Sequence, residues 1–123
     1  MPEHSLEGCH ILVVEDEYML ADELQTELSD LGATVVGPVG TIEDAIQLIA
    51  SDIRIDGAIL DVNLRGESVF PAADALTERR VPFLFATGYD QSVMPSRFAN
   101  TVLCEKPINI RWITEAIERI VHH

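Results

Sequence analysis

Five short runs of apolar residues, rich in valine, isoleucine and leucine, alternate along this chain with segments that have apolar residues at helical spacing. The runs cover residues 10–14, 33–37, 57–60, 83–86 and 101–103. Strands that are apolar on both sides are typical of parallel sheets, because helices cover both faces of such a sheet. The alternation therefore predicts a doubly wound α/β fold built on a five-stranded parallel sheet.

The segments between these runs predict helices, and the helical spacing of apolar residues is more regular in some of them than in others. The first places four leucines on one helical stripe and is followed by Gly32, which suits a helix C-terminus. Thr41 suits the N-cap of a second helix, and Pro71 fits the first turn of a third. The segment 90–99 is interrupted by Pro95 and predicts a short or irregular fourth helix. A last helix is marked by a stripe of Ile110, Ile113, Ile117 and Val121.

Length and charge limit the classes of protein that fit. A chain of 123 residues makes a single domain over 1–123 the natural expectation, with a core from about residue 9 to 121. The net charge of −13 argues against nucleic acid and anionic membranes as partners. We expect a cytoplasmic location, since the sequence has neither an apolar leader nor a run approaching the ~20 residues of a membrane span. Cys9 and Cys104 are expected to be free thiols at opposite ends of the sheet.

Polar side chains follow four of the five predicted strands, at the point where each strand ends. They are Glu15, Asp16 and Glu17 after the first strand, Asp61 after the third, Thr87 after the fourth and Lys106 after the fifth. The carboxyl ends of parallel strands meet at one edge of the sheet, so these groups should lie close together. Clustered carboxylates require a cation, and hard oxygen ligands suit Mg²⁺. We interpret Glu15, Asp16 and Asp61 as metal ligands, and Glu17 as a partner of the helix dipole.

A metal alone does not account for Asp61, which ends the apolar run GAILD. A carboxylate at that position can act as a nucleophile toward phosphorus. The Thr87 hydroxyl and the Lys106 ammonium could then contact phosphoryl oxygens, while Mg²⁺ neutralises the developing charge. The set fits the transfer of a phosphoryl group to an aspartate.

The segments ILVVEDE, ILDVNL, FATGY and EKP, in this order, resemble the receiver domain of two-component response regulators. The resemblance runs from about Cys9 to Val121. It implies the flavodoxin-like strand order 2-1-3-4-5 and a phosphoryl group received from a sensor histidine kinase or a histidine phosphotransfer protein. The FATGY segment is similar to a subgroup of stand-alone receivers from alphaproteobacterial stress signalling.

The family's functional residues carry over to matching positions of this chain. By resemblance, Glu15, Asp16 and Asp61 bind Mg²⁺, and the backbone carbonyl of Asn63 completes the protein ligands. Asp61 accepts the phosphoryl group, Thr87 is the switch hydroxyl and Lys106 binds the phosphoryl group. The resemblance also implies a cis Lys106–Pro107 bond, which proline permits at low cost. Two residues that begin the first helix are candidates for docking the phosphodonor: Tyr18 and Met19.

This sequence departs from the family pattern at Leu103, where receivers usually carry the aromatic residue that reports phosphorylation. Tyr89 lies two residues after Thr87. We therefore expect the loop from Tyr89 to Ala99 to carry the conformational change.

Three other functions share parts of this pattern. An aspartate-nucleophile phosphatase requires a second acid two residues after the nucleophile, and Asn63 stands there. A flavodoxin-like electron carrier requires a phosphate-cradling loop after the first strand, which is lacking. A receiver-like interaction module that is never phosphorylated stays open. We expect no turnover enzyme, but a phosphoacceptor that signals to a downstream protein or drains phosphoryl groups as a sink.

Overall fold

The computed structural model describes residues 5–88 and 94–122. Its centre is a parallel sheet with the strand order β2-β1-β3-β6-β7. The strands are β1 (His10–Val14), β2 (Thr34–Val39), β3 (Gly57–Asp61), β6 (Phe83–Thr87) and β7 (Leu103–Glu105). Since β4 (Asn63–Leu64) and β5 (Glu67–Ser68) form a separate small hairpin, this is the expected order 2-1-3-4-5, and the doubly wound α/β prediction is confirmed.

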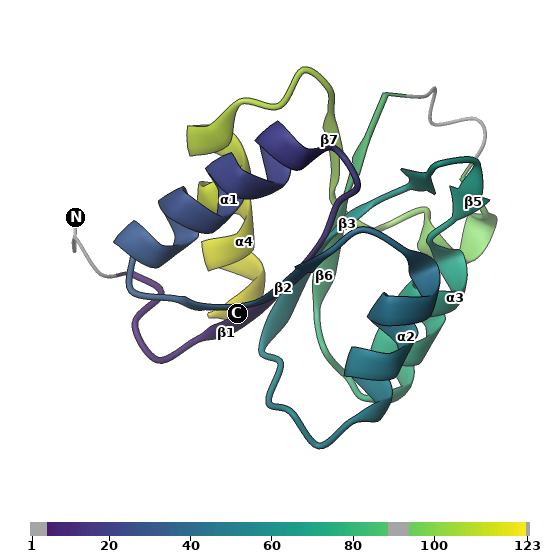
Figure 1. The fold of residues 1–123 in the computed structure, drawn as a ribbon, viewed down its shortest axis with the longest axis horizontal. Coiled ribbons are helices and arrows are strands. Elements are labelled where there is room, and N and C mark those ends of the chain that lie inside the picture. Colours follow the sequence, from purple (N-terminus) through teal and green to yellow (C-terminus); the bar gives the residue numbers. More distant parts are fainter. Residues whose placement is uncertain (1–4, 89–93, 123) are drawn as a thin grey trace.

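Two pairs of helices cover the sheet, one pair on each face (Figure 1). The helices α1 (Tyr18–Asp30) and α4 (Ile110–Val121) lie together on one face. The other face is covered by α2 (Ile42–Ala50) and α3 (Phe70–Glu78). The sheet is thus buried on both sides, as its apolar strands require.

Helix ends follow the local sequence. The Thr41 hydroxyl accepts a hydrogen bond from the Asp44 N–H at 3.1 Å and caps α2. Asn109 caps α4 in the same way, through the Trp112 N–H at 3.0 Å. After α1 the backbone turns at Gly32 with φ +94°, a conformation that favours glycine.

The core has one cluster on each side of the sheet. In one of them four phenylalanine rings meet: Phe70, Phe83, Phe85 and Phe98. The ring centroids of Phe85 and Phe98 are 5.3 Å apart in an edge-to-face arrangement, a favourable geometry for aromatic pairs. Phe98 therefore anchors the segment before β7 to the sheet.

The segment expected to form an irregular fourth helix contains a short 3₁₀ helix, η2 (Ser96–Phe98). Pro95 supplies its N-cap. The Arg97 guanidinium donates two hydrogen bonds to the Asp74 carboxylate, at 2.9 and 3.0 Å, which ties η2 to α3. Tyr89, the expected signalling residue, lies outside the described residues.

Some strand boundaries differ from the expectation. β7 begins at Leu103 rather than at residue 101, because the parallel register pairs Phe85 with Leu103. β2 runs on to Val39 through Pro38, which an edge strand tolerates. The two cysteines are free, Cys9 before β1 and Cys104 within β7.

Within residues 5–88 and 94–122, a two-stranded hairpin after β3 is the one element that the sequence pattern did not predict. It consists of β4 (Asn63–Leu64) and β5 (Glu67–Ser68), which pair antiparallel. Arg65 and Gly66 form its turn with φ +52° and +89°. Strands of two residues are too short for an alternating pattern to reveal.

Candidate acidic site at the carboxyl edge of the sheet

Three carboxylates meet where β1 and β3 end. Glu15 directly follows β1, and Asp61 is the last residue of β3, the neighbouring strand. One oxygen each of Glu15, Asp16 and Asp61 lie within 4.8 Å of one another. Two distant parts of the sequence thus form one site because their strands are parallel neighbours.

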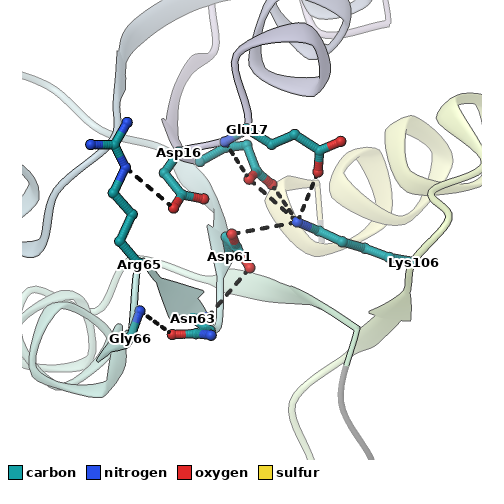
Figure 2. Close-up of polar contacts among 8 residues, drawn as sticks. Asp16, Glu17, Asp61, Asn63, Arg65, Gly66 and Lys106 are labelled. Carbon is teal, nitrogen blue, oxygen red and sulfur yellow. Dashed lines mark hydrogen bonds and ion pairs between the residues drawn. The ribbon is translucent and has the colours of Figure 1, made fainter.

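Lys106 reaches into this cluster from the loop after β7 (Figure 2). Its Nζ lies 3.3 Å from Glu15 Oε1, 3.3 Å from Glu17 Oε2 and 3.4 Å from Asp61 Oδ2. The Lys106 N–H also donates to the Thr87 carbonyl at 2.8 Å, which holds the loop against β6. It is the only lysine in the chain. The ammonium therefore links three carboxylates across the edge of the sheet.

The two central carboxylates are almost fully buried. The side chains of Glu15 and Asp61 are only 2% and 5% exposed to solvent. The Glu17 N–H donates to Glu15 Oε2 at 3.0 Å, and the Asn63 N–H donates to Asp61 Oδ1 at 3.4 Å. Backbone donors thus help to hold both carboxylates in place.

The pKa of Asp61 is raised to about 8, first by burial and then by the nearby Glu15 carboxylate, although Lys106 and the Asn63 N–H act against the shift. For Lys106, burial lowers the pKa. The charges of Asp61 and Glu15 outweigh that effect, so the pKa of Lys106 is raised overall. The raised pKa of Asp61 thus reflects first its burial and then its carboxylate neighbour, and the Lys106 ammonium does not fully offset these two effects.

This donor set fits a hard divalent cation. All three clustered groups offer carboxylate oxygens, which Mg²⁺ prefers, and one oxygen of each lies within 4.8 Å of the others. The residues present therefore fit the Mg²⁺ that the sequence led us to expect.

The other predicted residues lie at or beside this edge. Thr87 is buried at the end of β6, one residue beyond the position that pairs with Asp61. Asn63 is half-buried, and its side-chain oxygen accepts a hydrogen bond from the Gly66 N–H at 2.8 Å. The Lys106–Pro107 peptide bond is cis.

The candidate docking residues Tyr18 and Met19 begin α1, next to the acidic cluster. They are 84% and 81% exposed, so neither takes part in the core. Leu103, at the usual aromatic position, is half-buried beside the core cluster that contains Phe98.

The sequence did not predict two contacts of the site. Glu17 was interpreted as a partner of the helix dipole, but its carboxylate contacts Lys106. Glu17 is the N-cap of α1, but its side chain makes no capping hydrogen bond. The second contact is Arg65, whose Nε lies 3.8 Å from Asp16 Oδ2. No sequence pattern pointed to it, since it depends on the unpredicted hairpin turn.

The fold and the acidic edge with its lysine are those of the α/β signalling domains of response regulators. No family model matches the chain. The solution structure of SdrG from Sphingomonas melonis Fr1 is similar over 94% of this chain and 97% of SdrG, with 39% sequence identity and a TM-score of 0.79. The BeF3-activated conformation of SdrG matches over 98% of this chain and 99% of SdrG, with 38% identity and a TM-score of 0.75.

The chain belongs to the receiver domains of two-component response regulators. A further relative, the phyllosphere-induced regulator PhyR of Methylorubrum extorquens, is 37% identical over 91 residues, which are 72% of this chain and 32% of PhyR. The chain thus spans about a third of that protein. None of the helices in the described ranges is long and apolar enough to cross a membrane.

Proposed function

We propose that this domain accepts a phosphoryl group on Asp61 from a phosphorylated histidine of a sensor histidine kinase or a histidine phosphotransfer protein. One observation carries the proposal: the Lys106 ammonium lies 3.4 Å from Asp61 Oδ2, and the Asp61 carboxylate clusters with those of Glu15 and Asp16. Phosphoryl transfer requires a nucleophile that lies beside a fixed cation and beside oxygen ligands for a metal ion.

In this reaction an Asp61 carboxylate oxygen attacks phosphorus and forms a P–O bond. The P–N bond to the donor histidine breaks, and its electron pair stays on the imidazole nitrogen, which can take up a proton. The product is an acyl phosphate on Asp61. The backbone N–H of Asn63, 3.4 Å from Oδ1, helps to orient the carboxylate for attack.

Glu15, Asp16 and Asp61, with the backbone carbonyl of Asn63, would hold the Mg²⁺. When bound, this ion neutralises charge on the phosphoryl oxygens. The chain itself supplies the Lys106 ammonium for a second phosphoryl oxygen. Thr87, buried at the end of the adjacent strand, supplies a hydroxyl.

The phosphorylated domain would act on another protein or return its phosphoryl group to water as a sink. The exposed Tyr18 and Met19 beside the cluster are the proposed docking residues for the phosphodonor. Similarity to SdrG, which is described in a BeF3-activated conformation, supports a phosphoryl-dependent switch. The same similarity to SdrG supports placing this chain with the stand-alone receivers that its FATGY segment resembles. The protein is no turnover enzyme in this proposal, because it is itself modified.

The direct test is phosphorylation by acetyl phosphate in the presence of Mg²⁺, followed by intact-mass measurement. We expect the mass of one phosphoryl group to be added to the wild-type chain and to Asp52→Asn, whose side chain is exposed. Asp61→Asn should gain none. No addition to the wild type would favour a non-phosphorylated interaction module, and steady hydrolysis of phosphate esters would favour a phosphatase.

The sole lysine offers a second readout. With lysine labelled at Nζ, a single ammonium signal reports the site. Addition of beryllofluoride and Mg²⁺ should shift that signal in the wild type and leave it unchanged in Asp61→Asn.

A further inference from the structure

Arg65 lies at the turn of the β4–β5 hairpin, beside the acidic cluster (Figure 2). The hairpin begins at Asn63, two residues after Asp61, and the Asn63 side chain accepts a hydrogen bond from Gly66 at 2.8 Å. This bond and the positive φ angles of Arg65 and Gly66 determine the direction in which the arginine leaves the turn. The side chain extends toward Asp16.

The two cations near the site contact different carboxylates. Lys106 contacts Glu15, Glu17 and Asp61, whereas Arg65 Nε lies 3.8 Å from Asp16 Oδ2. Arg65 thus adds positive charge at the one clustered carboxylate that the lysine contacts do not include. The Asp16 side chain is 18% exposed and Arg65 is 80% exposed, so this pair lies at the solvent-facing side of the cluster.

We propose that Arg65 competes with the divalent cation for Asp16 and so lowers the metal affinity of the site. This inference rests on the proposed metal-dependent function. A guanidinium and a divalent cation beside the same carboxylate repel each other, and each reduces the attraction of the carboxylate for the other. Metal binding therefore weakens the contact between the guanidinium and Asp16, and this couples the site to the β4–β5 hairpin.

The geometry also limits the size of the effect. An ion pair with an N···O distance of 3.8 Å and an 80% exposed partner is weak, because water screens both charges. Arg65 therefore tunes the affinity and does not block the site. Its release costs little, since the guanidinium can remain solvated.

The test measures Mg²⁺ binding to the unphosphorylated protein by calorimetry, for the wild type and three variants. Arg65→Gln removes the charge, and Arg65→Lys retains it on the same turn. Arg119→Gln is the matched control, since Arg119 is exposed in the last turn of α4 and has the same charge. We expect Arg65→Gln to bind Mg²⁺ about two- to fivefold more tightly than Arg119→Gln, and Arg65→Lys to remain close to the wild type.

A second readout follows the arginine itself. In the wild type, the Arg65 Nε–H resonance should move during the Mg²⁺ titration with the same midpoint as the calorimetric curve. The Arg97 resonance, whose guanidinium pairs with Asp74, should stay in place.

The inference is overturned if Arg65→Gln binds Mg²⁺ no more tightly than Arg119→Gln, or if the Arg65 resonance does not respond. In that case Mg²⁺ still binds and the proposed function stands. Failure of the wild type and of all variants to bind Mg²⁺ would instead overturn the metal site, and this inference with it.

Discussion

The ammonium of Lys106 lies 3.4 Å from the Asp61 carboxylate, although 45 positions separate the two residues in the sequence. The contact spans the ends of β3 and β7, which are not adjacent in the sheet because β6 lies between them. The lysine side chain therefore bridges one strand to reach the aspartate. This relationship determines both the charge balance of the site and how it responds to substitution.

Replacing Lys106 should destabilise the metal-free protein. Lys106→Met leaves Asp61 and Glu15 buried without their ammonium, and we expect a loss of about 1–3 kcal/mol in the free energy of unfolding at pH 7.5. Mg²⁺ should recover part of this loss, because it neutralises the same carboxylates. Urea unfolding with and without Mg²⁺ measures both effects, with Arg111→Met, an exposed position on α4, as control. Equal stability of Lys106→Met and the wild type would show that the ammonium is not needed for charge balance.

Replacing Asp61 should have the opposite effect on stability. In the folded protein the pKa of Asp61 is raised from 3.8 to about 8. The protonated carboxyl therefore contributes stability that is fully present below pH 3.8 and is lost as the pH rises through about 8. Asp61→Asn removes this dependence, and we expect it to be more stable than the metal-free wild type by about 1–3 kcal/mol at pH 7.5.

Urea unfolding of metal-free protein at pH 5 and pH 8 tests this expectation. The difference in the free energy of unfolding between Asp61→Asn and the wild type should increase from pH 5 to pH 8. Asp52→Asn, an exposed position, should show the same pH dependence of stability as the wild type. An advantage that stays constant with pH would contradict the role assigned to the Asp61 charge.

Asp56, at the opposite end of the sheet, should stabilise the fold in its ionised form. Its Oδ2 accepts a hydrogen bond from the His10 N–H at 2.7 Å, and Arg54 Nε lies 3.1 Å away. Burial alone would raise the pKa of Asp56, but these partners outweigh burial and lower it. We expect Asp56→Ala to cost about 1–3 kcal/mol at pH 7. The contribution is present above pH 3.8 and is lost as the pH falls through the lowered pKa.

The matching experiment is urea unfolding of Asp56→Ala and the wild type at pH 7 and in strong acid. The difference in stability should shrink in acid, because the wild-type carboxylate is then protonated. A difference that is the same at both pH values would indicate lost packing and not a lost charge.

Cys104 should be unreactive in the folded protein. Burial raises the pKa of its thiol to about 11, so very little thiolate exists at neutral pH. The pKa of Cys9 is also raised, mainly by burial and also by Asp56, but Cys9 is half-buried and more accessible. With a disulfide reagent at pH 8, we expect Cys104→Ser to keep the faster reaction of Cys9 and Cys9→Ser to react much more slowly. Fast labelling of folded Cys9→Ser would contradict this.

The order of the elements could be predicted because apolar periodicity is a local property. Leu20, Leu24 and Leu28 are buried on α1 as their spacing predicts, and the Thr41 cap forms as expected. The edge on which the site lies also followed from the sequence, since residues after parallel strands share one side of the sheet. The start of β7 was displaced because strand register depends on the partner strand, which the run at 101–103 does not specify.

The residues of this chain alone determined a doubly wound sheet and the three acidic side chains, one threonine and one lysine at its carboxyl edge. The tertiary structure decided which charged groups form ion pairs. Glu17 contacts Lys106, and the β4–β5 turn places Arg65 beside Asp16. The reason is physical: a hydrophobic pattern is set by residues a few positions apart, whereas an ion pair depends on distances of a few ångströms between side chains that only the assembled sheet brings together.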